Sequence, residues 1–213
     1  MQLIIESLPM LFRGLLVTIR LFSGGLLIGF LLGMILAIAR LYGGRFTAGL
    51  AKAYSRTMRS IPLLVLLVML YLLITGVLAD LTPFYTAIIA IGMRSAAYQA
   101  EIFRTAISSV SSGEAMAGKS LGLSNLQVFR LIILPQALRN AIAPWSNEAA
   151  IVVKSSSMAF VIGAPELLRQ ATYVAARTRQ PLLMYSAAGA VYLFIVFVFD
   201  RVLEKLDQRF KIP

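Results

Sequence analysis

The residue types in this chain restrict the chemistry that it can perform. Its 213 residues contain no Cys and no His. This removes thiolate nucleophiles, disulfides, imidazole general bases and nearly all zinc chemistry. Nine carboxylates, twenty Lys and Arg side chains and the hydroxyls remain. Any chemistry of the chain must use these groups, and we expect no catalytic residue, no metal site and no cofactor held by the chain itself.

One segment, GEAMAGKS at 113–120, matches the phosphate-loop pattern G-x-x-x-x-G-K-S/T letter for letter. A phosphate loop requires a buried strand before it and a helix after it. Here the end of an apolar segment and a serine-rich turn precede Gly113, and Glu-Ala-Met-Ala favours a helix over a loop. We interpret the match as chance, and nucleotide binding through Lys119 stays as a competing hypothesis.

Arg94 lies about ten residues into an apolar segment. If this segment is a membrane helix, its rise of about 1.5 Å per residue places Arg94 near the middle of the membrane. A cation there is a functional candidate, because its burial is costly unless it faces a wet cavity or a partner. The alternative is an internal ion pair with Glu101, which lies two turns away on the same helix face. Both interpretations stay open, and Tyr98 in the same segment is a further candidate substrate contact.

Lys154 lies at a similar depth in a later apolar segment, six residues after Glu148. The same argument favours a functional role for Lys154 over an ion pair with Glu148. Three hydroxyls follow it and are candidate substrate contacts: Ser155, Ser156 and Ser157. The alternative for these serines is a hydrogen bond to the backbone carbonyl one turn back.

The elements that must position these residues are membrane helices. Hydrophobic residues make up 59% of the chain, charged residues only 14%, and the mean hydropathy is +0.84. A helix that crosses the hydrocarbon layer needs about 20 mostly apolar residues. We predict an all-α membrane protein of one domain, 1–213, with five transmembrane helices. Their expected ranges are about 11–39, 58–79, 84–107, 141–163 and 183–203, and the first is not interpreted as a removable leader.

Basic residues predict the orientation of these helices. Five Lys and Arg residues lie between the first and second spans, four between the third and fourth, and four after the fifth. Such an excess marks cytoplasmic loops, so we expect the N-terminus outside and the C-terminus in the cytoplasm of a multi-pass cell-membrane protein. The same distribution explains the formal charge of +11 by contact with the lipid bilayer, and a nucleic-acid partner is not expected. The longest cytoplasmic segment is then 111–138.

This segment carries Met116, Ala117 and Gly118, then three residues, Gly122, nine residues, and Ile132, Leu134 and Pro135. This spacing resembles a motif of the ABC importer permeases of bacteria and archaea. The motif reads E-A-A, three residues, Gly, nine residues, Ile-x-Leu-Pro. With the motif proline at Pro135, the matched positions are Met116 for the glutamate, Ala117 and Gly118 for the alanines, and Gly122 for the glycine. The chain departs from the family at the glutamate, since neighbouring Glu114 is out of register by two.

Four blocks extend the likeness along most of the chain. They are 58–64 (MRSIPLL), 95–104 (SAAYQAEIFR), 132–139 (IILPQALR) and 154–158 (KSSSM). In this order and on these spans they resemble the polar amino acid branch of the ABC importer permeases. The resemblance implies the MetI-like fold of type I importers and a transport subunit that is not an enzyme.

The resemblance also implies the partners of the chain. They are a second permease chain in a homodimer or heterodimer, a cytoplasmic ABC ATPase dimer that binds ATP and Mg, and an extracytoplasmic solute-binding protein that delivers a polar amino acid. We expect Gly113 to break the chain, a short helix over 114–120 to dock on the ATPase, and Gly122 with Ser124 to form the next turn. The residues expected to couple to the ATPase are Gly113, Glu114, Met116, Ala117, Gly118, Lys119 and Gly122.

The substrate class follows from one departure in the block at 154–158. Permeases of this branch commonly read Lys-Asp-Thr-Ser-Leu there, and Ser155 replaces the acid. A cavity without that carboxylate is net positive, which favours an acidic or neutral polar amino acid over a basic one. The alternatives are a basic amino acid permease of the same family and a stand-alone secondary carrier, for which inverted repeats are expected and none is visible.

Overall fold

The computed structural model describes residues 2–77 and 82–210, and within these ranges every regular element is a helix. The α-helices are α1 (Gln2–Tyr42), α2 (Arg45–Ser60), α3 (Leu63–Val77), α4 (Pro83–Ser108), α5 (Ser112–Ser120), α6 (Asn125–Val128), α7 (Leu134–Ser156), α8 (Leu167–Thr178) and α9 (Pro181–Phe210). A π-helical segment, Phe129–Ile133, joins α6 to α7, and a 3-10 segment, Ser157–Ile162, follows α7. The all-α prediction is confirmed.

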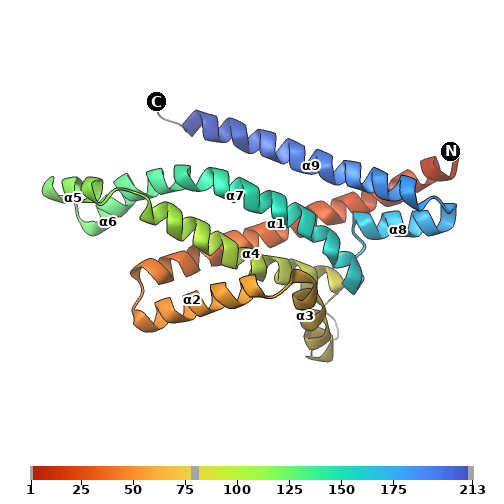
Figure 1. Ribbon diagram of the computed structural model, residues 1–213, viewed down its shortest axis with the longest axis horizontal. Coiled ribbons are helices and arrows are strands. Elements are labelled where there is room, and N and C mark those ends of the chain that lie inside the picture. Colours follow the sequence, from red (N-terminus) through yellow and green to blue (C-terminus); the bar gives the residue numbers. More distant parts are fainter. Residues whose placement is uncertain (1, 78–81, 211–213) are drawn as a thin grey trace.

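The helices form an elongated bundle with α4 at its centre (Figure 1). Helix α4 packs against α1, α2, α3 and α7, whereas α9 contacts α7 and α8. The short helices α5 and α6 project at one end of the bundle, and α8 lies at the other. Consequently α5 and α6 are exposed beyond the long helices that connect to them.

Small residues allow α1 and α4 to pack closely. Glycines recur every fourth residue on α1, at Gly25, Gly29 and Gly33, and so share one face. A Cβ added at Gly33 would lie 2.9 Å from the Cβ of Gln99 and 3.1 Å from the backbone nitrogen of Ala100. Side chains on this face would therefore force the two helices apart.

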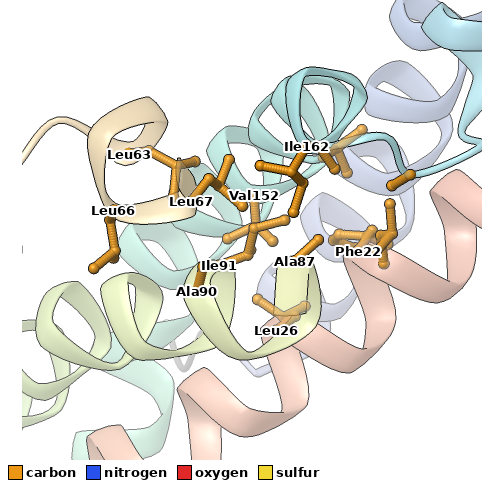
Figure 2. Packing of buried hydrophobic residues seen from close by; sticks show 14 of the residues in the cluster. Phe22, Leu26, Leu63, Leu66, Leu67, Ala87, Ala90, Ile91, Val152 and Ile162 are labelled. Carbon is orange, nitrogen blue, oxygen red and sulfur yellow. The ribbon is translucent and has the colours of Figure 1, made fainter. Parts of the chain in front are cut away.

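The largest buried cluster joins α1, α3, α4, α7 and the 3-10 segment Ser157–Ile162 (Figure 2). Leu63 and Leu67 at the start of α3 pack with Ile91 of α4, Val152 of α7 and Leu26 of α1. Burial of such side chains contributes roughly 1.5–3 kcal/mol each. This cluster fixes the start of α3 against the central helices.

Two helices are long and apolar enough to cross a membrane alone, over Ser7–Tyr42 and Pro181–Lys205. Two bent pairs pass the same test together, so up to four spans are obtained if each pair is one span. Helix α4 falls outside this set although it has 26 residues, because polar and charged residues lower its hydropathy. Half of its residues are buried within the protein, so its polar side chains need not face lipid.

The helix predicted over 58–79 differs in its start. Residues 58–60 end α2, and the chain bends by 106° before α3 begins at Leu63. Pro62 causes the break, because proline disfavours a helical conformation at the preceding residue, and Ile61 is extended with φ −85° and ψ 127°. The predicted end of this span at 78–79 lies outside the described residues.

The remaining boundaries shift for local reasons. Pro135 lies directly after the π-helical segment Phe129–Ile133, and the helix is continuous from Asn125 through this proline into α7. The span predicted at 141–163 is therefore continuous with residues from 134 onward.

The loop between the spans predicted at 141–163 and 183–203 contains the helix α8. Its first turn is capped by the Glu166 carboxylate, at 2.7–2.8 Å from two backbone nitrogens. Helices α1 and α9 extend beyond the predicted 11–39 and 183–203, and α4 agrees with 84–107 to within one residue at each end.

Candidate coupling helix and substrate site

Helix α5 begins one residue before Gly113. The Ser111 hydroxyl caps it by accepting a hydrogen bond from the Gly113 N–H at 3.2 Å. Glu114 lies in the first turn and Lys119 in the last, where their charges are favourable for the helix dipole. The expectation that Gly113 breaks the chain is therefore wrong, since Gly113 is helical and Ser111 marks the boundary.

One face of α5 packs on the segment that leads into α7. Gly118 is its buried residue, and a Cβ there would lie 2.5 Å from the Cδ1 of Ile132 and 3.3 Å from the Cγ2 of Val128. The Gln136 side-chain amide also donates a hydrogen bond to the Glu114 carboxylate. The absence of a side chain at Gly118 thus lets α5 rest directly on the start of the long helix.

A tight turn follows α5. Gly122 has φ +83°, a left-handed conformation that favours glycine. Ser124 then begins α6 with a capping box, in which its side chain and that of Gln127 each bond the other residue's backbone. The turn predicted at Gly122 and Ser124 is confirmed.

The opposite face of α5 and its turn is open and partly apolar. Met116 is 63% exposed and Leu121 is 83% exposed. Ala117 and Lys119 are exposed beside them. Apolar side chains that project at one end of the bundle are suited to packing against another protein.

The same geometry argues against a phosphate loop at 113–120. The segment is an α-helix, so most of its backbone N–H groups are used within the helix and cannot wrap a phosphate. Helix α4 precedes it in place of a buried strand. Lys119 is consequently one exposed cation on a helix.

Arg94 stacks on Tyr98 one turn along α4. Its guanidinium carbon lies 4.9 Å from the ring centroid, and Nη2 donates to the Tyr98 hydroxyl at 3.3 Å. The guanidinium of Arg59 lies 5.9 Å from the same ring centroid. Among the described residues, the buried Nε of Arg94 has no hydrogen-bond partner. This part of α4 therefore carries positive charge on an aromatic surface.

Glu101 does not pair with Arg94. Its carboxylate instead binds three other arginines: Arg40 at 2.5 Å, Arg104 at 2.9 Å and Arg59 at 3.3 Å. These ion pairs join α1, α2 and α4. The ion-pair interpretation of Arg94 with Glu101 is wrong, because arginines from two neighbouring helices occupy the carboxylate.

A buried hydrogen-bond chain that the sequence interpretation missed connects α1, α4 and α7. The Ser95 hydroxyl donates to Glu148 at 2.8 Å, and the Gln99 amide donates to Ser95 at 3.0 Å and to the Leu26 carbonyl at 3.2 Å. The Trp145 indole N–H donates to the Gln99 carbonyl at 2.8 Å. The sequence did carry one signal for this chain, because the polar residues Ser95 and Gln99 lie four residues apart and so share one face of α4. Glu148 is thus bonded to Ser95, and no ion pair with Lys154 forms between these described residues.

The serine block at 155–157 has mixed surroundings. Lys154 is exposed, whereas Ser155 and Ser156 are buried. Ser156 and Ser157 donate to the carbonyls three residues back, at 2.6 and 2.7 Å. The two hydroxyl protons are therefore already used, as the local alternative predicted, and among the described residues no hydrogen bond or ion pair joins this block to Arg94 or Tyr98.

Long apolar helices with a short exposed helix between two of them fit a membrane transport subunit that another protein can contact. Residues 26–212 match the family model described as "Binding-protein-dependent transport system inner membrane component". The chain belongs to this family. It is an amino acid ABC transporter permease of the polar type and not an enzyme, since ATP is hydrolysed by a separate ATPase.

Curated relatives cover nearly the whole chain. It is 37% identical to the nopaline transport system permease protein NocM of Agrobacterium fabrum, over 94% of this chain and 88% of the relative. It is 34% identical to the glutamine transport system permease protein GlnP of Escherichia coli, over 97% and 95%. The glutamate/aspartate import permease protein GltK of E. coli is 33% identical, over 97% and 96%.

Solved structures agree on the fold. A crystal structure titled as an amino acid ABC transporter with histidines superposes with a TM-score of 0.89 and 29% identity, covering 97% of this chain and 96% of that one. A chain of the inward-facing MetNI methionine ABC transporter gives 0.84 with 18% identity, covering 97% and 99%. The MetI-like type I permease fold is thereby confirmed.

Proposed function

We propose that this chain is one of two permease chains in an importer for an acidic or neutral polar amino acid. ATP hydrolysis in a partner ATPase would move α5, and α5 would move α7. Five crossings, in α1, α3, α4, α7 and α9, would place the N-terminus outside and α5 in the cytoplasm. The family's dependence on an ATPase and a binding protein supports this assembly.

The observation that carries the coupling proposal is the seating of α5. It contacts the start of α7 through Gly118 and through the Glu114–Gln136 hydrogen bond, while Met116 and Leu121 stay exposed. A short helix bound on one side and open on the other can transmit displacement to the helix on which it rests. Met116 occupies the motif's glutamate position, so we expect apolar packing against the ATPase there in place of a salt bridge.

Single cysteines test orientation and coupling together, because the chain has no native Cys. Met116→Cys lies in α5, and Leu182→Cys, at a position 82% exposed, lies at the opposite end of the bundle. A membrane-impermeant maleimide should label Leu182→Cys from outside and Met116→Cys only in inverted vesicles. In the assembled importer, Met116→Cys should crosslink to the ATPase. Labelling of Met116→Cys from outside would contradict the proposal.

The substrate proposal depends on charge. Lys154 is exposed and Arg94 is half-buried, whereas the carboxylate of Glu148 is buried and bonded to Ser95. The accessible charge around these positions is then positive, which suits a substrate with a surplus carboxylate or a neutral polar side chain. Relatives named for glutamine and for glutamate/aspartate transport support this choice.

The test is stimulation of ATPase activity in the reconstituted importer by glutamate, glutamine and arginine, each with its binding protein. We expect glutamate or glutamine to stimulate most, and Lys154→Ala to lower the response to glutamate more than the response to glutamine. A clear preference for arginine would refute the charge argument and favour the basic amino acid alternative.

A further inference from the structure

A groove between α7 and α9 lies outside the coupling helix and the substrate candidates. It has a volume of about 490 Å³ and is lined almost entirely by apolar atoms. Its walls come from four helices, α1, α4, α7 and α9, and Arg139 is its charged lining residue. Six of its lining residues are Phe30, Phe103, Leu138, Arg139, Ile142 and Trp145.

The lining residues of α7 follow one face in a definite order. Arg139, Ile142 and Trp145 are three residues apart, so they stack along the helix. Arg139 is nearest the α5 end, and Trp145 lies about 9 Å further into the bundle at about 1.5 Å per residue. The groove thus has a cation near its outer end and aromatic rings at depth, where Phe30 lies 6.3 Å from Trp145 between ring centroids.

Arg139 is available to bind an anion. It is half-buried, and it forms no ion pair or hydrogen bond with any residue whose side chain the structure describes. A half-buried guanidinium favours a bound phosphate, because Arg presents donors in a planar fork that matches phosphate oxygens. The neighbouring cavity, beyond Leu203, has the opposite character, since Asp200 and Glu204 line it. Charge therefore distinguishes the two sides of the α7–α9 contact.

We propose that this groove binds one acyl chain of an anionic phospholipid, with the lipid phosphate at Arg139. The occupant is an amphiphile because the site is itself amphiphilic along the membrane normal: a cation at the end that we place in the cytoplasm, then aliphatic and aromatic side chains toward the bilayer centre. Basic pockets between membrane helices on the cytoplasmic side bind lipid headgroups by the same physics. Only 11% of the most apolar stretch of α9 is buried within the chain. The bilayer therefore has access to the groove along this helix.

A bound lipid would contact, at Trp145, the buried hydrogen-bond chain that joins α1, α4 and α7. Trp145 lines the groove and donates its indole N–H to Gln99, which belongs to the buried chain joining α1, α4 and α7. An acyl chain against the indole would hold this ring in place. The lipid site stands apart from the importer function, so its failure would leave the permease assignment intact.

The experiment is native mass spectrometry of the purified full-length chain, with phosphatidylglycerol or phosphatidylcholine added at equal concentration. The wild-type chain should retain one phosphatidylglycerol in preference. Arg139→Gln should weaken retention of phosphatidylglycerol roughly fivefold, the effect of one cation near an anionic lipid. Arg139→Lys keeps the charge but loses the planar fork of donors, so it should restore retention in part. Ile142→Trp should fill the groove and reduce retention of both lipids.

Matched variants and assembly state make the test decisive. Glu204→Gln changes a charge on the other side of Leu203 and should leave retention of phosphatidylglycerol unchanged. Each variant must elute as the wild type does in size exclusion, and Arg139→Lys separates loss of charge from loss of fold. Equal retention of the two lipids by the wild type would overturn the proposal. So would crosslinking of Leu138→Cys to a second permease chain in the assembled importer, because the groove would then be a protein interface.

Discussion

A bulky side chain at Gly118 should uncouple the transporter while the membrane helices stay folded. A Cβ there would already lie 2.5 Å from the Ile132 Cδ1 and 3.3 Å from the Val128 Cγ2, whereas carbon atoms pack best at about 3.5–4.0 Å. In Gly118→Leu the first added carbon alone requires a movement of about 1 Å, and three more carbons must fit on the same face. Overpacking of this kind costs about 1–3 kcal/mol.

The cost falls on the seating of α5, because its buried contact with the start of α7 is made at Gly118. A change of 1–3 kcal/mol shifts an equilibrium by about 5–150-fold. We therefore expect ATP-driven amino acid uptake in proteoliposomes with the ATPase and binding protein to fall about 5-fold or more. The basal activity of the ATPase subunit alone does not involve this chain and serves as the internal reference.

Two further variants complete this prediction. Gly49→Leu is the matched control, since a Cβ at Gly49 in α2 meets nothing within 4 Å. Gly118→Leu combined with Ile132→Ala should recover part of the uptake by removing the nearest clashing atom. Uptake by Gly118→Leu within twofold of the wild type would refute the argument that α5 works through this contact.

Three other outcomes are expected. Gly33→Ala should lower the free energy of unfolding in detergent by about 1–3 kcal/mol, because the new methyl would meet the α4 backbone. Gly76→Ala, the control, should be neutral or slightly stabilising. Equal unfolding midpoints for the two variants would contradict the close α1–α4 packing. Glu101→Gln should lower the free energy of unfolding by about 2 kcal/mol, because it weakens charged hydrogen bonds to three arginines, and this effect should shrink at high salt. An unchanged unfolding midpoint would show that the ion pairs of Glu101 contribute nothing to stability. Lys119→Ala should leave nucleotide binding by the isolated chain undetectable, as in the wild type; specific ATP binding that this change abolishes would revive the phosphate-loop hypothesis.

Boundaries that depend on local sequence were predictable, and those that depend on tertiary packing were not. Helix α4 was placed correctly because an apolar run begins just after Pro83 and ends at a serine-rich turn. The break at Pro62 carried a local signal, but the uninterrupted apolar composition after it favoured one long span. Helix α8 was missed although Glu166 caps its first turn locally, because the segment is short and polar and was interpreted as a loop between two spans.

The partners of the polar residues in the long helices could not be derived from helix periodicity. Glu101 was compared with Arg94 on its own helix, yet two of its three arginines lie 61 and 42 residues away in sequence, on α1 and α2. Ser95 and Glu148 are 53 residues apart and meet because α4 and α7 pack side by side. By contrast, the Gly122 turn and the Ser124 cap were readable, because they need only residues within one turn.

The central claim is that this chain provides the path for the solute while a separate ATPase supplies the free energy. The most direct measurement is accumulation of labelled glutamate or glutamine against its gradient in proteoliposomes that contain the permease chains, with and without the ATPase and the binding protein. We predict ATP-dependent accumulation only when all components are present. Uphill accumulation by the permease chain alone would contradict the account.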